Sequence, residues 1–287
     1  MQASTNPKSP IVLITGCSSG GIGYALCEAF AAQGCIVYAT SRRLESMSTL
    51  THPSIHCLEM DVTSDHSVKN GVEQVIHEAG RVDFAIANAG IPCYGPVLDL
   101  SIEDAKATMD TNVLGVLRLA QAVLPHMASR QQGTFMTLGS VSGYSAVPWG
   151  GFYCASKAAA NLLTETLQME AQALSPHIAV TLVVAAAVRT KFPSNSKFRL
   201  PESSLFGFCA PKIKSVAEIP LGDSVMAPSQ FADSVVQAAL KKPRSSQSLY
   251  YGTHTIIFWI LRLLPIWLSH WVFWKLYGGE KSHEGKI

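Results

Sequence analysis

Short apolar segments alternate with longer helix-like segments over most of the chain, and this alternation limits the fold more than any other feature. The strand-like runs cover residues 11–15, 36–41, 55–62, 84–87, 134–140, 178–184 and 248–251. The helix-like runs cover residues 22–33, 65–79, 112–130, 153–173 and 230–241. Strands that are apolar without alternation are buried on both faces. The pattern therefore predicts an α/β fold in which a single doubly wound parallel sheet carries helices on both faces.

Composition narrows the class of protein further. The chain has 287 residues, of which 48% are hydrophobic, so it can bury a large core and is not a disordered protein. Its formal charge is only +2, which gives no electrostatic reason to expect nucleic acid as a partner. The seven cysteines form no Cys-x-x-Cys pair, and no secretory signal opens the chain. We expect reduced thiols, no metal site and a domain that faces the cytosol.

Three parts follow from the pattern: a flexible N-terminus (1–10), one domain (11–252) and an apolar tail (253–287). Within the domain, residues 191–228 are rich in proline and weakly periodic, which predicts a long loop with short helical pieces that covers a substrate. Its scattered cations either meet a phosphate or are simply solvated. They are Lys191, Lys197, Arg199, Lys212 and Lys214.

A glycine-rich segment, Thr15–Gly23, lies between the first predicted strand and the first predicted helix. Glycines there allow a tight turn and let backbone amides approach a pyrophosphate at the helix N-terminus. This strand–loop–helix position favours Rossmann-type dinucleotide binding over an ordinary turn. The candidate contacts are Gly16, Ser18, Ser19, Gly21, Ile22 and Gly23.

The ends of the next strands supply further candidates. The second strand ends in Ser41-Arg42-Arg43, where an acidic residue would hold the ribose 2′-hydroxyl of NAD. Two guanidinium groups suit a 2′-phosphate, so we expect NADP(H), the alternative being a solvated arginine pair. Asp61 and Val62 close the third strand, where a carboxylate could reach the adenine. The fourth strand ends in Asn88, Ala89 and Gly90. Each of these residues taken alone could be an ordinary turn residue.

Tyr153 and Lys157 are four residues apart in a predicted helix and therefore lie on the same face. A phenol has a pKa near ~10, and an adjacent ammonium is expected to lower it. Such a pair can exchange a proton with an alcohol or ketone oxygen. The motif alone is common and is usually a surface pair.

Taken together, these motifs resemble the short-chain dehydrogenase/reductases from about residue 11 to residue 240. Asn112 and Ser140 complete the set, and Ser140 lies 13 positions before Tyr153 (153 − 140 = 13). The resemblance implies that Tyr153 is the general acid of carbonyl reduction and that Ser140 bonds the substrate oxygen. It implies that Lys157 holds the nicotinamide ribose and Asn112 a relay water, and that the protein is a homo-oligomer. A capping asparagine and a turn serine are the structural alternatives.

Two segments depart from the family pattern. The glycine loop is one residue longer than usual, with four residues between Gly16 and Gly21. Where the family often has Pro-Gly-x-Val-x-Thr, residues 185–190 are Ala-Ala-Ala-Val-Arg-Thr. Val188 and Thr190 are still expected to face the nicotinamide amide.

Residues 37–47, 200–204, 250–253 and 264–268 resemble a narrower group, the fungal NADPH-dependent 1-acyldihydroxyacetone-phosphate reductases. That likeness implies a lipid-like ketone substrate. One alternative is a short-chain dehydrogenase that acts on a ketone or alcohol of fungal secondary metabolism. Another is a non-catalytic, membrane-anchored nucleotide-binding module.

The tail is the most apolar part of the chain and holds four of the five tryptophans. Arg262 and Pro265 interrupt it, and basic residues flank both ends: Lys241, Lys242 and Arg244 before, Lys275, Lys281 and Lys286 after. A buried arginine and symmetric positive flanks argue against a spanning helix and favour an interfacial one. We expect association with the endoplasmic reticulum membrane or lipid droplets, the alternative being a tail packed on the domain or on a dimer partner.

Overall fold

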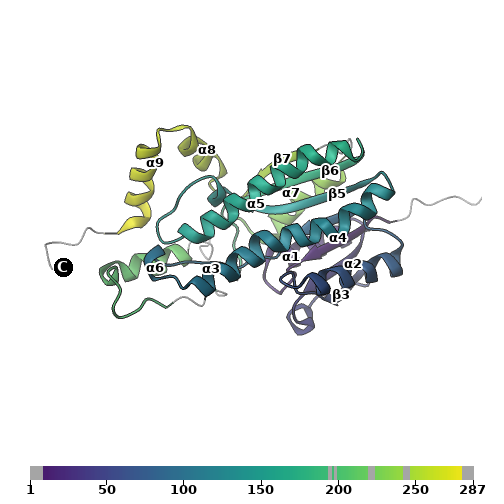
Figure 1. Ribbon diagram of the computed structural model, residues 1–287, viewed down its shortest axis with the longest axis horizontal. Coiled ribbons are helices and arrows are strands. Elements are labelled where there is room, and N and C mark those ends of the chain that lie inside the picture. Colours follow the sequence, from purple (N-terminus) through teal and green to yellow (C-terminus); the bar gives the residue numbers. More distant parts are fainter. Residues whose placement is uncertain (1–8, 193–195, 197–198, 219–223, 242–245, 280–287) are drawn as a thin grey trace, which may run out of the picture.

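The computed structural model describes residues 9–192, 196, 199–218, 224–241 and 246–279. They contain one seven-stranded sheet in the order β3-β2-β1-β4-β5-β6-β7, and every ladder in it is parallel (Figure 1). The strands are β1 Ile11–Thr15, β2 Ile36–Ser41, β3 Ile55–Glu59, β4 Phe84–Ala87, β5 Gly133–Ser140, β6 Ile178–Ala185 and β7 Gln247–Tyr251. The predicted doubly wound α/β sheet is confirmed.

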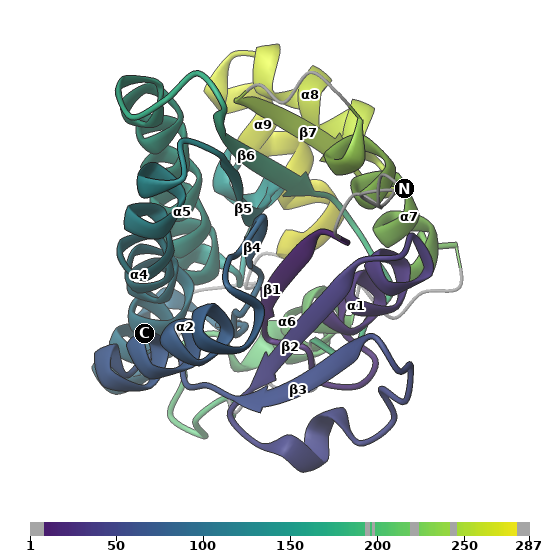
Figure 2. The same ribbon diagram turned by 90° about the vertical axis from the view of Figure 1, so that its right-hand side faces the viewer.

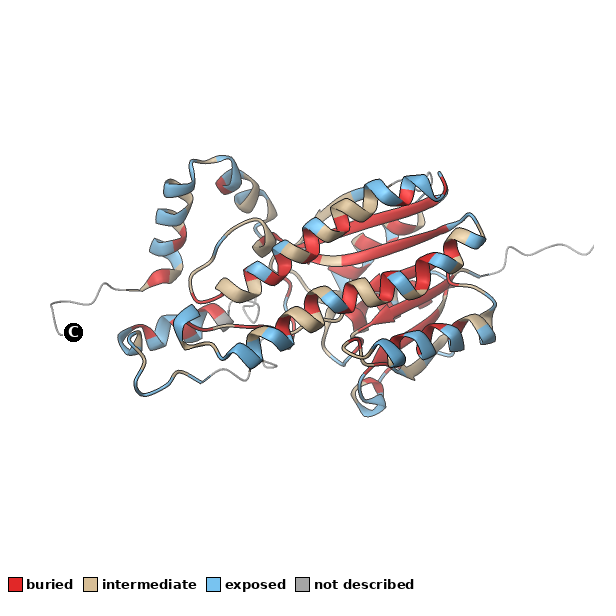
Figure 3. Ribbon diagram, viewed as in Figure 1, coloured by how far each residue is buried: buried red, intermediate tan, exposed pale blue. Residues whose placement is uncertain are grey.

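Helices cover both faces of the sheet, as Figure 2 shows. One face carries α1 (Ile22–Ala32) and α7 (Pro228–Leu240), which pack on the strands through one hydrophobic cluster. The opposite face carries α2 (Asp65–Ala79), α4 (Gly115–Ser129) and α5 (Gly151–Glu170). Buried residues of α2 and α4 belong to a second cluster, against which Leu163 and Leu167 of α5 pack. Strands β1, β4 and β6 are buried along their whole length (Figure 3) because each of their faces is covered.

Two predicted boundaries are wrong near the carboxyl edge of the sheet. β3 ends at Glu59, so Asp61 and Val62 lie in the turn after the strand. The helix predicted to begin at residue 112 instead starts with a π-helical turn, Asp110–Leu114, preceded by α3 (Ile102–Met109). Helix α3 is short and mostly exposed, so it lacks the apolar periodicity that reveals a helix.

The predicted long loop contains α6 (Ala210–Glu218), and the tail forms α8 (Thr255–Leu263) and α9 (Ile266–Phe273), with Pro265 between them. Figure 1 shows α3, α6 and the tail helices beyond the carboxyl ends of the strands. Among the described residues, no helix is long and apolar enough to cross a membrane. Lys197, Lys242, Arg244, Lys281, Lys286 and residues 1–8 lie outside the described part of the chain.

One side of the tail contacts the domain. The guanidinium carbon of Arg262 lies 4.3 Å from the ring centre of Tyr144 and 5.1 Å from that of Trp259. The indole nitrogen of Trp149 donates to the carbonyl oxygen of Tyr277 at 2.8 Å. Arg262, which argues against a spanning helix, is thus used in a cation–π contact with the domain.

Candidate functional site

Ser140 and Tyr153 come together from two different elements. Ser140 is the last residue of β5, and Tyr153 lies in the first turn of α5. The Ser140 hydroxyl faces the phenol, whose pKa it acts to lower, and accepts from the backbone N–H of Ser142 at 3.1 Å. The serine therefore both stabilises the turn after β5, as its structural alternative requires, and faces the phenol.

Lys157 lies one turn further along α5 and is 6% exposed. Its ammonium donates to the carbonyl oxygen of Leu138 at 2.9 Å. Burial lowers the pKa of Lys157 to about 8. A Cβ added at Gly90 would lie 3.8 Å from the Lys157 nitrogen and 3.3 Å from the Asn112 side-chain oxygen. The loop after β4 therefore runs beside both side chains, and glycine leaves open the space that a side chain would fill.

Asn112 is buried within the π-helical turn, so it is not the capping residue of the alternative interpretation. Its side-chain oxygen accepts from the N–H of Ile91 at 2.8 Å. Its amide group donates to the carbonyl of Ile91 and to the Ser156 hydroxyl, both at 3.0 Å. Asn112 thus joins the loop after β4 to α5 and fixes the distance between these two elements of the candidate site.

The pKa of Tyr153 departs from the sequence-based expectation. Burial raises it well above the usual value, the nearby Tyr94 raises it further, and the nearby Ser140 hydroxyl only partly opposes them. Lys157 is not among the groups that shift this pKa, which differs from the predicted lowering, and its ammonium donates to the carbonyl of Leu138. The phenol ring contacts those of Tyr94 and Phe192, at centroid distances of 5.9 and 5.7 Å. Tyr153 is therefore a neutral phenol near pH 7.

The glycine loop is held against the end of β4. The Asn88 amide donates to the carbonyls of Thr15 and Gly16, at 2.7 and 3.0 Å. Gly16 has a φ of +74°, and a Cβ there would lie 2.7 Å from the Cα of Ala89. Only glycine fits this position, because the conformation is left-handed and the neighbouring backbone is too close. The side chain of Asn88 thus helps to fix the conformation of the glycine loop.

Four more predicted contacts lie in or just after this loop. The N–H of Ser19 donates to the Ser46 carbonyl at 2.8 Å, and that of Gly21 donates to the Ser18 carbonyl at 3.1 Å. Ile22 and Gly23 occupy the first turn of α1, where backbone N–H groups have no partner within the helix. The helix N-terminus is therefore the part of the loop best suited to bind an anion.

A group of three hydroxyls lies between the glycine loop and the end of β2. The Ser41 hydroxyl is 3.1 Å from that of Ser18 and 2.8 Å from that of Ser46. The neighbouring Arg42 and Arg43 are exposed. Ser46 was missed by the sequence analysis, because nothing marks it in the four-residue 3₁₀-helix after the strand. Hydroxyl donors beside two exposed guanidinium groups fit a ribose that carries a 2′-phosphate.

The other predicted contacts lie along the same edge. The Asp61 carboxylate accepts from the N–H and the hydroxyl of Thr63, at 2.9 and 2.8 Å. Val62 is buried, as are Val188 and Thr190 in the segment after β6. The Thr190 hydroxyl accepts from the N–H of Phe192 at 3.3 Å. The contacts of Asp61 and Val62 with the adenine side of the cofactor, and of Val188 and Thr190 with the nicotinamide amide, remain predictions.

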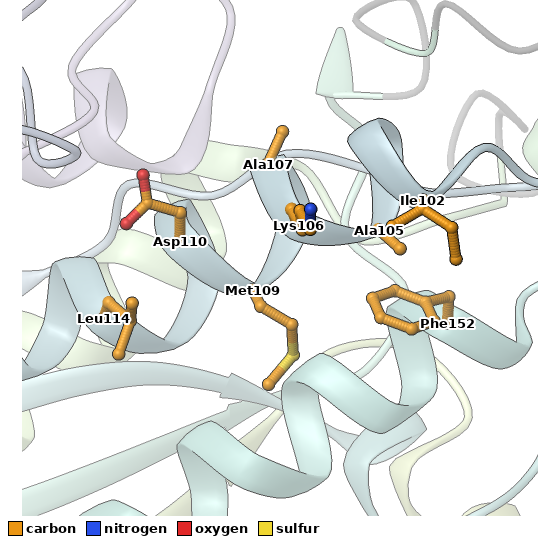
Figure 4. Close-up of a pocket in the computed structure, with 8 residues that line it drawn as sticks. All are labelled: Ile102, Ala105, Lys106, Ala107, Met109, Asp110, Leu114 and Phe152. Carbon is orange, nitrogen blue, oxygen red and sulfur yellow. The ribbon is translucent and has the colours of Figure 1, made fainter.

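A separate apolar groove of about 570 Å³ lies between α3, the π-helical turn and α5 (Figure 4). Met109, Leu114 and Phe152 are among the residues that line it. None of the predicted catalytic residues does, so the groove is distinct from the candidate site.

The family model for short chain dehydrogenases matches residues 10–198. The chain belongs to the short-chain dehydrogenase family. It is therefore an oxidoreductase. This agrees with the position of Ser140, Tyr153 and Lys157 near the carboxyl edge of the sheet.

Its relatives include fungal proteins. The chain is 38% identical over 203 residues to an NADPH-dependent 1-acyldihydroxyacetone phosphate reductase of Schizosaccharomyces pombe, which covers 68% of this chain and 67% of that protein. It is 34% identical over 271 residues to the short-chain dehydrogenase ptmH of Penicillium ochrochloron, which covers 93% and 97%. A crystal structure of a short-chain dehydrogenase from Streptomyces avermitilis aligns with a TM-score of 0.78 at 26% identity, over 95% and 98% of the two chains.

Proposed function

We propose that this protein is an NADPH-dependent carbonyl reductase, and that Ser140, Tyr153, Lys157 and Asn112 form its catalytic site. The proximity of the Ser140 and Tyr153 side chains, at the edge that carries the glycine loop, supports this most directly. The glycine loop also supports it, because a Cβ at Gly16 would lie too close to the backbone of Ala89. The three serine hydroxyls at the end of β2, together with the exposed Arg42 and Arg43, favour NADPH over NADH.

The residues divide the work of carbonyl reduction. When bound, the reduced nicotinamide would supply a hydride to the carbonyl carbon. Ser140 orients the carbonyl oxygen by a hydrogen bond, and Tyr153 gives that oxygen its proton as charge develops on it. Lys157 binds the ribose hydroxyls, and Asn112 keeps the loop after β4 in register with α5. A phenol whose pKa is raised holds its proton at neutral pH, as a proton donor in carbonyl reduction must.

Tyr153→Phe tests the proton donor. The variant keeps the ring contacts with Tyr94 and Phe192 but loses the hydroxyl, so NADPH oxidation should fall by at least about 100-fold, the usual contribution of a positioned acid. NADPH affinity, measured by fluorescence titration, should change little. Turnover retained in this variant would contradict the role of Tyr153. NADPH binding without turnover by the wild type, over a broad ketone panel, would favour the non-catalytic module.

For the substrate, we propose a lipid-like ketone such as 1-acyldihydroxyacetone phosphate. The similarity to the S. pombe reductase supports it, as does the apolar tail, whose Tyr277 carbonyl accepts from the Trp149 indole just before α5. A secondary-metabolite ketone is the second candidate, because the short-chain dehydrogenase ptmH, to which the chain is similar over 93% of its length, has a name that specifies no substrate. A competition assay with an acyldihydroxyacetone phosphate and its dephosphorylated analogue separates the two. Preference for the phosphorylated ketone supports the first, and equal or reversed preference supports the second.

We also propose that the outer face of the tail docks on a lipid surface facing the cytosol, at the endoplasmic reticulum or on lipid droplets. Large apolar side chains remain exposed there although the inner side packs on the domain: Ile256, Ile260, Leu263, Ile266, Trp267 and Trp271. Residues 255–279 contain no acidic side chain, which suits anionic headgroups.

Sedimentation with anionic phospholipid vesicles tests the docking face. Trp267→Ser combined with Leu263→Ser should release the protein from the vesicles. Leu162→Ser removes another exposed leucine, 65% exposed and located on α5, and is the control, expected to sediment like the wild type. Equal sedimentation of all three would refute the docking face. The homo-oligomer that the family resemblance implies remains a prediction.

A further inference from the structure

The segment after β6 crosses the glycine loop. The backbone N–H of Lys191 donates to the carbonyl of Gly20 at 3.2 Å. A Cβ added at Gly20 would lie 3.0, 3.2 and 3.3 Å from Cδ, Cγ and Cε of Lys191. The aliphatic part of the lysine therefore lies directly over Gly20, a residue with a φ of +78° in the lengthened loop.

The position of this side chain places a positive charge near the helix N-terminus. The Lys191 ammonium is one C–N bond, about 1.5 Å, beyond Cε, so it lies close to Gly20. Gly20 immediately precedes Gly21 and Ile22, where α1 begins and its first N–H groups are oriented toward an anion. The chain thus brings a cation from the segment after β6 to the positive end of α1. An anion at that point would meet both.

We propose that Lys191 binds the pyrophosphate of the dinucleotide cofactor from the side opposite the α1 N-terminus. The proposal depends on the cofactor class given above and adds a residue that neither the glycine motif nor the catalytic motif contains. A lysine suits this task because its ammonium acts as a point charge on phosphate oxygens.

The same segment reaches the catalytic tyrosine. Phe192 follows Lys191 directly, and its ring centre lies 5.7 Å from that of Tyr153. A lysine that is fixed by a bound pyrophosphate therefore also fixes the aromatic wall beside the proton donor. Lys191 is a positioning residue in this respect, since it acts on Tyr153 only through Phe192.

Cofactor affinity is the readout that tests the proposal. NADPH and NADH share the pyrophosphate and differ at the 2′-phosphate. Lys191→Met should raise the dissociation constants of both cofactors by the same factor, about tenfold, as expected for one charge-assisted hydrogen bond. Lys191→Arg should retain most of the affinity. Fluorescence titration of the full chain measures each constant, and Lys69→Met, an exposed lysine on α2, is the control that should bind like the wild type.

The outcomes separate this proposal from the proposed function. Unchanged affinity in Lys191→Met, with tight binding by the wild type, would overturn only the role of Lys191. Weakened binding of NADPH alone would place Lys191 at the 2′-phosphate and would also overturn it. A wild type that binds neither cofactor would refute the proposed function and this inference with it.

Discussion

Replacing Lys157 by methionine should stabilise the cofactor-free protein near pH 7. Burial lowers the pKa of Lys157 to about 8, from 10.5 in an exposed lysine. The folded state therefore holds its proton less tightly than the unfolded state, and the charged side chain costs about 3 kcal/mol below pH 8. Loss of the hydrogen bond from the ammonium to Leu138 offsets about 1 kcal/mol. A net gain of about 2 kcal/mol at pH 7 remains, although catalysis should be lost.

The pH dependence gives the sharper test. Because the folded pKa is depressed, the penalty is complete below about pH 8 and disappears between the folded and unfolded values. Linkage predicts that the advantage of Lys157→Met over the wild type shrinks by about 2 kcal/mol between pH 7 and pH 9.5. Urea denaturation followed by tryptophan fluorescence at both pH values measures the difference. Lys69→Met serves as the exposed control and should show no such change. A constant difference between Lys157→Met and the wild type would refute the reasoning.

Three further predictions concern the site and its support. Ser140→Ala should lower kcat by about 100-fold or more with little change in cofactor affinity, because in the proposed mechanism the serine acts on the substrate oxygen and not on the cofactor; steady-state kinetics and binding assays measure the two effects. Gly16→Ala should cost about 2 kcal/mol of unfolding free energy in urea, since the φ of +74° strains any side chain and Ala89 blocks the Cβ. Asp83→Asn should cost about 3 kcal/mol, because this buried carboxylate binds two arginines, Arg81 and Arg130, and thermal unfolding should show it.

The sequence predicted the order of strands and helices well, because buried parallel strands appear as continuous apolar runs between glycine-marked turns. Gly34 and Gly80 end their helices with φ values near +80°, as the sequence indicated. Helix α3 was missed although Ser101 and Asp104 form a capping pair at its start. A short exposed helix leaves only that polar signal, and the apolar pattern gives none.

The sequence predicted which residues form the candidate site, but it did not predict the direction of the Tyr153 pKa shift. The motif spacing placed Ser140 and Tyr153 together, since residues at the end of one strand and the start of the next helix share an edge of the sheet. The direction of the Tyr153 pKa could not be obtained this way. It depends on Tyr94, 59 positions away (153 − 94 = 59), and on where the Lys157 ammonium points. Such terms arise from tertiary packing and leave no local pattern in the sequence.

The place of β1 in the sheet affects how the chain emerges from the ribosome. β1 lies between β2 and β4, and Val12 pairs with Phe84, which is 72 residues later (84 − 12 = 72). At about 5 to 20 residues per second, that partner is made about 4 to 14 s after Val12. During this interval one edge of an apolar strand has no neighbour and could pair with another nascent chain. Cells that overproduce this protein should therefore need chaperones early in its translation, before the dinucleotide half is complete.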